Sequence, residues 1–70
     1  MENIYTKRQL ISIAAFLFGQ NKKCGMFMKN GKELVVTPTD NGYNVTLNGE
    51  CIYNGNNEYA LGMELYTKHN

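Results

Sequence analysis

The chain has 70 residues, a net charge of +1 and 43% hydrophobic residues, and these values predict one globular domain over residues 1–70. The near-neutral charge argues against a general nucleic-acid binder, because such proteins have a strong excess of Lys and Arg. Two cysteines do not make a disulfide scaffold, and the apolar run from Leu10 to Phe18 is too short to span a bilayer and lacks a signal-peptide pattern. We therefore expect a cytoplasmic protein that makes no membrane contact.

The first predicted element is a helix that begins after Thr6 and stops at Gly19. Thr6 and Gln9 have the spacing of a capping box, in which each side chain accepts a hydrogen bond from the backbone amide of the other residue. Tyr5, just before the cap, occupies the outer position of a hydrophobic staple. The apolar residues of the helix fill an arc of about 200°. Phe16 lies outside that arc, which makes it a candidate contact for a partner.

Four Asn-Gly pairs lie in the middle of the chain, and Asn-Gly between alternating apolar residues is a strong signal for a β-hairpin. These pairs predict an antiparallel meander of four strands. The strands are expected near residues 24–29, 32–38, 43–48 and 50–54.

Two-residue turns at the Asn-Gly pairs would set the register of the sheet. These turns would place three apolar pairs opposite each other, namely Phe27 with Leu34, Val36 with Leu47, and Val45 with Ile52. A longer loop remains an alternative for the second turn, at Asn41-Gly42, because Pro38 lies just before it. One face of the sheet is then apolar and the other is mixed. The mixed face contains Met26, Met28, Glu33, Val35, Thr37, Asn44, Thr46, Cys51 and Tyr53.

The last segment, residues 56–68, fits either a helix or a fifth strand. Asn56 or Asn57 offers an N-cap and good helix formers follow, which favours the helix. Gly62 costs this helix about 1 kcal/mol but permits a close approach to the sheet. We therefore predict an α+β fold of two layers, with an N-terminal helix, a four-stranded antiparallel meander and a C-terminal helix. Both helices are expected on one face of the sheet.

The sequence offers no motif for catalysis or metal binding. Its single serine, Ser12, lies on a helix, while Asp40 and His69 lie in a turn and near the end of the chain, so nothing in the sequence brings a catalytic triad together. Two cysteines and one histidine do not supply a zinc site. Cys51 is interpreted as a small hydrophobic residue in a strand rather than as a reactive thiol. We expect no enzymatic activity, cofactor or metal.

Two surfaces are candidates for binding a partner. The first helix should run back over the sheet and bring its basic residues toward the first hairpin, whose tip is also basic. Four positive charges there would suit an acidic protein or a phosphate. The mixed sheet face and Phe16 are the second candidate. The residues concerned are Lys7, Arg8, Lys29 and Lys32 at the basic tip, Met26, Met28, Val35 and Tyr53 on the sheet, and Phe16 on the helix.

These features lead to the hypothesis of a non-enzymatic protein-binding module, a small inhibitor or adaptor acting on a larger host complex. Small motif-free proteins rich in Lys, Asn and Tyr are common among phage-encoded inhibitors, including anti-CRISPR-like proteins. Two alternatives stay open, namely nucleic-acid contact through the basic tip and a small-ligand or nucleotide-binding oligomer. The oligomer would line a pocket between subunits with Tyr43, Tyr53, Tyr59 or Tyr66. A homodimer is expected because so short a chain has a small core.

The expected register also predicts the state of the cysteines. Cys24 and Cys51 would lie on the outer strands, on the same face, three strand spacings or about 14 Å apart. A disulfide requires Cα atoms within about 7 Å, so both thiols should be free in the monomer.

Overall fold

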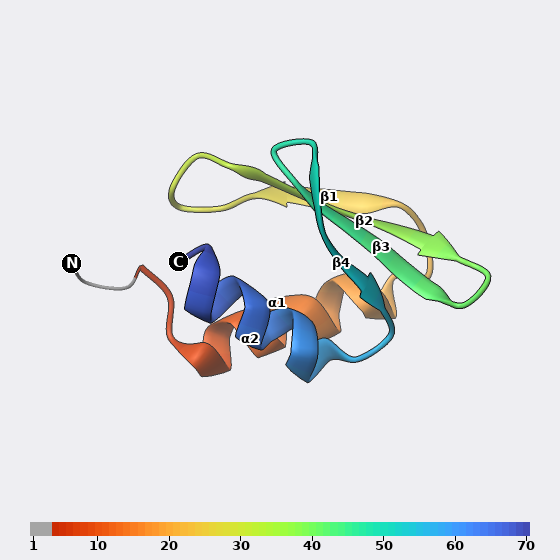
Figure 1. Cartoon of the computed structure of the whole chain (residues 1–70), viewed down its shortest axis with the longest axis horizontal. Coiled ribbons are helices and arrows are strands. Elements are labelled where there is room, and N and C mark those ends of the chain that lie inside the picture. The colour runs from red at the N-terminus through yellow and green to blue at the C-terminus, as the bar shows by residue number, and fades with distance from the viewer. Residues whose placement is uncertain (1–3) are drawn as a thin grey trace.

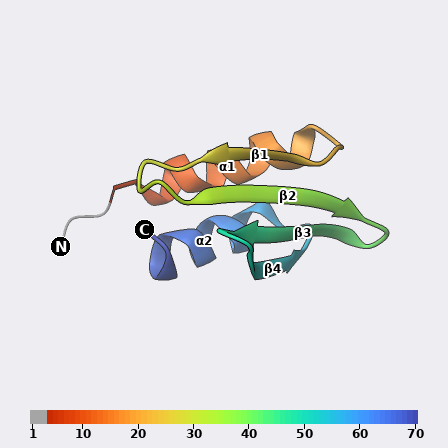
Figure 2. The same cartoon turned by 90° about the horizontal axis from the view of Figure 1, so that it is seen from above.

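The computed structural model describes residues 4–70 and contains two helices and four strands. The elements are α1 (Lys7–Gly19), β1 (Cys24–Phe27), β2 (Glu33–Thr39), β3 (Gly42–Leu47), β4 (Glu50–Gly55) and α2 (Glu58–Lys68). The strands form one antiparallel sheet in the order β1-β2-β3-β4. Both helices lie against the same face of the sheet and run antiparallel to each other (Figure 1, Figure 2). The predicted α+β fold is confirmed, and the last segment is a helix.

α1 begins as its sequence predicts. The Thr6 hydroxyl accepts a hydrogen bond from the Gln9 amide at 3.1 Å, and the Gln9 Oε1 accepts one from the Thr6 amide at 2.9 Å. The capping box is therefore complete. Tyr5 and Leu10, the two positions of the staple, are both buried. The core lies between the sheet and the two helices. The most deeply buried side chains are Leu10, Leu34, Val36, Val45, Leu61 and Leu65.

The register between β1 and β2 differs by one residue from the prediction. Met26 pairs with Leu34, where the prediction set Phe27 opposite Leu34. The Met28 amide donates to the Lys32 carbonyl oxygen at 2.9 Å, so three residues rather than two form the loop. At the Asn-Gly pair only the glycine, at residue 31, has a positive φ (85°). This pattern is typical of a three-residue hairpin that closes with a G1 bulge.

The one-residue difference exchanges the two faces of β1, because side chains alternate along a strand. Met28 is buried with 3% of its surface exposed, and Met26 packs against the core. Phe27 points to the opposite face and is 71% exposed. The prediction of Met26 and Met28 on the mixed face, and of Phe27 in the core, is therefore wrong.

The second turn lies one residue earlier than predicted. Thr39 pairs with Gly42, so the turn consists of residues 40–41, and Val36 pairs with Val45 instead of Leu47. Neither turn residue has a positive φ, which suits a type I turn with glycine as its fourth residue. The pairing moves by two residues, so the buried faces of β2 and β3 stay as predicted.

The third turn is confirmed at Asn48-Gly49, whose φ values of 54° and 86° fit a type I′ hairpin. Thr46 pairs with Cys51 as expected. A β-bulge next to Thr46 then brings Tyr53 opposite Val45. Tyr53 consequently packs against the core, and its hydroxyl accepts a hydrogen bond from the Asn57 amide at 3.0 Å. The prediction of Tyr53 on the mixed face is wrong.

α2 is capped by Asn57, whose side chain accepts from the backbone amides of Tyr59 and Ala60. Gly62 is buried against α1 rather than against the sheet. A Cβ atom at residue 62 would lie 2.5 Å from Cγ1 and 2.9 Å from Cα of Ile11. The glycine therefore sets the distance between the two helices.

Candidate functional site

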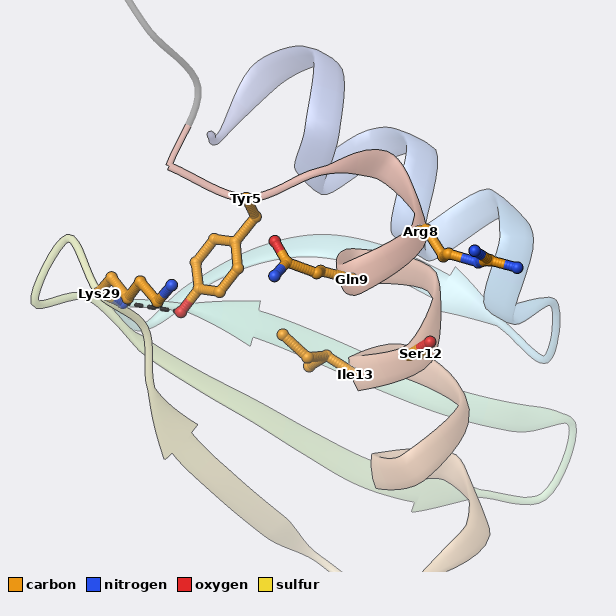
Figure 3. Close-up of a pocket in the computed structure, with 6 residues that line it drawn as sticks. All are labelled: Tyr5, Arg8, Gln9, Ser12, Ile13 and Lys29. Carbon is orange, nitrogen blue, oxygen red and sulfur yellow. Dashed lines mark hydrogen bonds between the residues drawn. The ribbon is translucent and has the colours of Figure 1, made fainter.

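A groove of about 420 Å³ lies where the start of α1 meets the β1–β2 hairpin (Figure 3). We call it the α1 groove. Tyr5 and Ile13 form its apolar wall, and the other lining residues are polar or basic. The α1 groove is lined by Tyr5, Arg8, Gln9, Ser12, Ile13 and Lys29.

Tyr5 holds the α1 groove together. Its backbone amide donates to the Asn70 side chain at 2.8 Å, and its carbonyl oxygen accepts from the same side chain at 2.7 Å. Its hydroxyl accepts a hydrogen bond from the Lys29 amide at 2.9 Å (Figure 3). These contacts join α1, the hairpin and Asn70, so the wall of the groove is fixed before any partner binds.

Two cations border the α1 groove. The Lys29 ammonium lies 5.1 Å from the centroid of the Tyr5 ring, at cation–π distance. Arg8 lines the groove at its edge, and its guanidinium points away from Tyr5, Gln9 and Lys29 (Figure 3). Within residues 4–70, Glu64 forms the ion pair with Lys68, and the His69 Nε2 lies 3.7 Å from the same carboxylate. Neither Lys29 nor Arg8 forms an ion pair with a described carboxylate.

The remaining polar groups of the α1 groove favour donation of hydrogen bonds. The Oε1 of Gln9 already accepts from the Thr6 amide, which leaves the two N–H groups of its Nε2 for the groove. Ser12 adds a hydroxyl. Lys29 and Arg8 have donors and no acceptor.

The structure divides the predicted basic tip. The contact between Tyr5 and Lys29 brings the start of α1 to the first hairpin, as expected. Of the four basic residues, Arg8 and Lys29 share the α1 groove. Lys7 faces α2, with its ammonium 5.9 Å from the centroid of the Tyr66 ring. Lys32 lines a second hollow of about 170 Å³, together with residues that include Glu50 and His69.

The face of the sheet away from the helices has fewer apolar residues than the sequence indicated. We call it the open face, and it contains Phe27, Val35, Thr37, Asn44, Thr46, Cys51 and Asn54. Three of the four sheet residues predicted to bind a partner there point toward the helices, and Val35 remains. The homodimer stays a prediction, and light scattering over a range of concentrations tests it. Phe16 is 66% exposed on α1.

The cysteines agree with the prediction in part. Both are free and lie on the outer strands. They do not share a face, because Cys24 pairs with Val36 and its thiol donates to the Leu17 carbonyl oxygen at 3.5 Å. Cys51 is exposed on the open face, where its sulfur accepts from the Asn44 side chain at 3.2 Å.

The tyrosine pocket was predicted between subunits and stays a prediction; within the single chain, over residues 4–70, the tyrosines make separate contacts. Tyr43 stacks on Phe18 with ring centroids 4.2 Å apart, and its hydroxyl donates to the Phe18 carbonyl oxygen. Tyr53 packs against the core and Tyr66 lies beneath Lys7. In the same residues, no three His, Cys, Asp or Glu side chains lie close enough together to hold a metal ion.

Sequence reasoning missed four residues of the α1 groove as site residues: Tyr5, Gln9, Ser12 and Ile13. Tyr5 and Gln9 were assigned to the helix cap alone. One signal was present, because a buried tyrosine hydroxyl requires a hydrogen-bond partner. The partner, Lys29, lies 24 residues further along the chain, and local patterns do not identify it.

Neither helix of the described chain has the length and apolar character needed to cross a membrane. Comparisons with family models, with curated proteins and with solved structures found no match.

Proposed function

We propose that this chain is a non-enzymatic protein-binding module, a small inhibitor or adaptor that acts on a larger host complex through the α1 groove. The observation that supports the proposal is the α1 groove itself, an apolar hollow bordered by Arg8 and Lys29, which form no ion pair within residues 4–70. Protein interfaces combine an apolar centre with a polar rim and are enriched in Tyr and Arg. We extend the proposal to the class of phage-encoded, anti-CRISPR-like inhibitors, among which small motif-free chains are common.

The rigidity of the α1 groove also supports binding of a protein. Tyr5 is held by three hydrogen bonds, and the capping box fixes the first turn of α1. A surface that is already ordered loses little conformational entropy on association, so more of the contact energy is available for affinity.

Phe16 extends this surface along α1. It follows Ser12 by four residues and Ile13 by three, so it lies on the same side of the helix. Its ring is 66% exposed. Aromatic residues, Phe among them, are enriched in protein interfaces, so an exposed ring beside a basic groove suits contact with a partner.

Capture of a partner from a host lysate tests the proposal. The tagged chain should retain one large protein at a stoichiometric level, and Lys29→Glu should lose it because the substitution reverses a cation of the α1 groove. The matched control is Lys23→Glu, an equal change of charge at an exposed residue before β1. Circular dichroism verifies that both variants fold. Equal capture by both variants would move the interface to the open face, where Phe27→Ala and Val35→Asp are the next changes.

A further inference from the structure

We infer that the α1 groove recognises a carboxylate next to an apolar side chain, in an acidic segment of the partner protein. This inference rests on the proposed function and specifies the chemistry of the segment that enters the groove. It follows from the hydrogen-bonding groups, the charge and the apolar wall of the groove, each of which restricts the ligand separately.

The hydrogen-bonding groups select an acceptor. The hydrogen bond from the Thr6 amide to Gln9 Oε1, at 2.9 Å, orients the side-chain amide of Gln9 and leaves both N–H groups of Nε2 as donors. Lys29 and Arg8 only donate, and Ser12 has a hydroxyl that either donates or accepts. An ionised carboxylate accepts hydrogen bonds and has no donor, so it is complementary to this set of groups.

The charge of the α1 groove selects an anion. Lys29 and Arg8 form no ion pair within residues 4–70. The positive end of the α1 dipole adds to their field, and the first turn of α1 contains no acidic residue to offset it. α2 differs, since Glu58 occupies its first turn. The basic groove is therefore left without an internal counter-charge in the described chain.

The apolar wall favours a peptide over a nucleic acid. Ile13 offers an apolar surface to a side chain next to the carboxylate, and the exposed ring of Phe16 continues it along α1, while the largely buried Tyr5 ring backs the groove. Grooves that bind single-stranded nucleic acids use exposed aromatic rings on which bases stack. The Tyr5 ring is only 7% exposed and the Lys29 ammonium lies 5.1 Å from its centroid, so Phe16 is the one exposed ring on this surface of the described chain, where successive bases would need several.

An NMR titration of the full ¹⁵N-labelled chain tests the inference. The probe is the tetrapeptide Asp-Leu-Glu-Phe, acetylated and amidated so that its side chains provide its only carboxylates. We expect saturable shifts of the Gln9 side-chain amide and the Lys29 backbone amide. The uncharged peptide Asn-Leu-Gln-Phe should bind about ten times more weakly, the loss that corresponds to one charge-assisted hydrogen bond. Lys29→Glu should remove the shifts and Lys23→Glu should retain them.

The titration also gives results that would overturn the inference. Equal binding of the two peptides would refute recognition of a carboxylate. Stronger shifts of the same resonances by a thymidine decanucleotide would assign the α1 groove to nucleic acid, and absence of shifts with the acidic peptide at millimolar concentration would refute the inference outright. If lysate capture still depends on Lys29 while the peptide fails, the proposed function stands and this inference falls. If the peptide binds but no protein is captured, recognition of the carboxylate stands and the proposed function falls.

Discussion

Replacement of Gly62 by alanine sets helix propensity against helix packing. In an exposed helix the change stabilises by about 1 kcal/mol. Here the new Cβ would lie 2.5 Å from Cγ1, 2.9 Å from Cα and 3.0 Å from the backbone nitrogen of Ile11. The Ile11 side chain can rotate, but its backbone belongs to α1, so the two helices must move apart. Overpacking of this kind costs about 1–3 kcal/mol, and contact with backbone atoms places the cost in the upper part of that range.

We therefore expect Gly62→Ala to lower the free energy of unfolding by about 1–2 kcal/mol, after the gain in propensity is subtracted. Urea unfolding followed by far-UV circular dichroism measures it, and a loss of 1 kcal/mol lowers the Tm by about 4–8 °C in a domain of this size. Gly19→Ala is the matched control, because residue 19 is also helical and nothing lies within 4 Å of its added Cβ. Equal stabilisation by both substitutions would refute the close approach of the helices.

Three further predictions concern the core, the site and the cysteines. Leu17→Ala should lower the free energy of unfolding by about 2–5 kcal/mol, because Leu17 is 3% exposed, and a urea titration that gives less than about 1 kcal/mol would contradict this burial. Tyr5→Phe should cost about 0.5–1.5 kcal/mol, the net contribution of one hydrogen bond, because it removes the partner of the Lys29 amide in an exposed loop, and unchanged stability would argue against that hydrogen bond. Iodoacetamide should modify Cys51 before Cys24, because Cys51 is exposed and Cys24 is half-buried; mass spectrometry that finds the opposite order would reverse the faces assigned to β1 and β4.

The elements of this fold could be predicted from local sequence, because local interactions determine them. The capping box located the start of α1 at the correct residue, Thr6. Asn57 and the helix formers after it favoured a helix over a fifth strand, and α2 is present. The alternation of apolar residues in β2 and β3 gave the buried faces of both strands, and a shift of two residues in their pairing did not change them.

The register of β1 could not be predicted, because the Asn-Gly dipeptide is compatible with several turns. At residues 48–49 both φ values are positive, whereas at residues 30–31 only the glycine has a positive φ. The dipeptide is the same in both places, so tertiary packing makes the choice. In β1 this packing buries Met28 and exposes Phe27. One residue of register was enough to misplace Met26 and Met28, two of the residues assigned to a partner, and the β-bulge next to Thr46 misplaced a third, Tyr53.

Only the positive charge of the α1 groove could be predicted from the sequence. The expected course of the first helix back over the sheet predicted that the start of α1 and the first hairpin would form one basic region, and Arg8 and Lys29 do line the same groove. The polar and apolar residues that line the groove could not be predicted from the sequence. Gln9 belongs to both the cap and the groove, and the contact of Tyr5 with Lys29 exists only in the folded chain.

The central claim is that the partner protein covers the α1 groove, and the hydrogen-exchange footprint of the complex tests it most directly. Amides in the first turn of a helix have no partner within the helix, so those of Lys7 and Arg8 should exchange rapidly in the free chain. Any slowing of their exchange in the complex then reports protection by the partner. The account predicts slower exchange at these amides and at Lys29 when the captured protein is bound, with no change at Lys23. Protection along the open face around Cys51, with none at the start of α1, would contradict the claim.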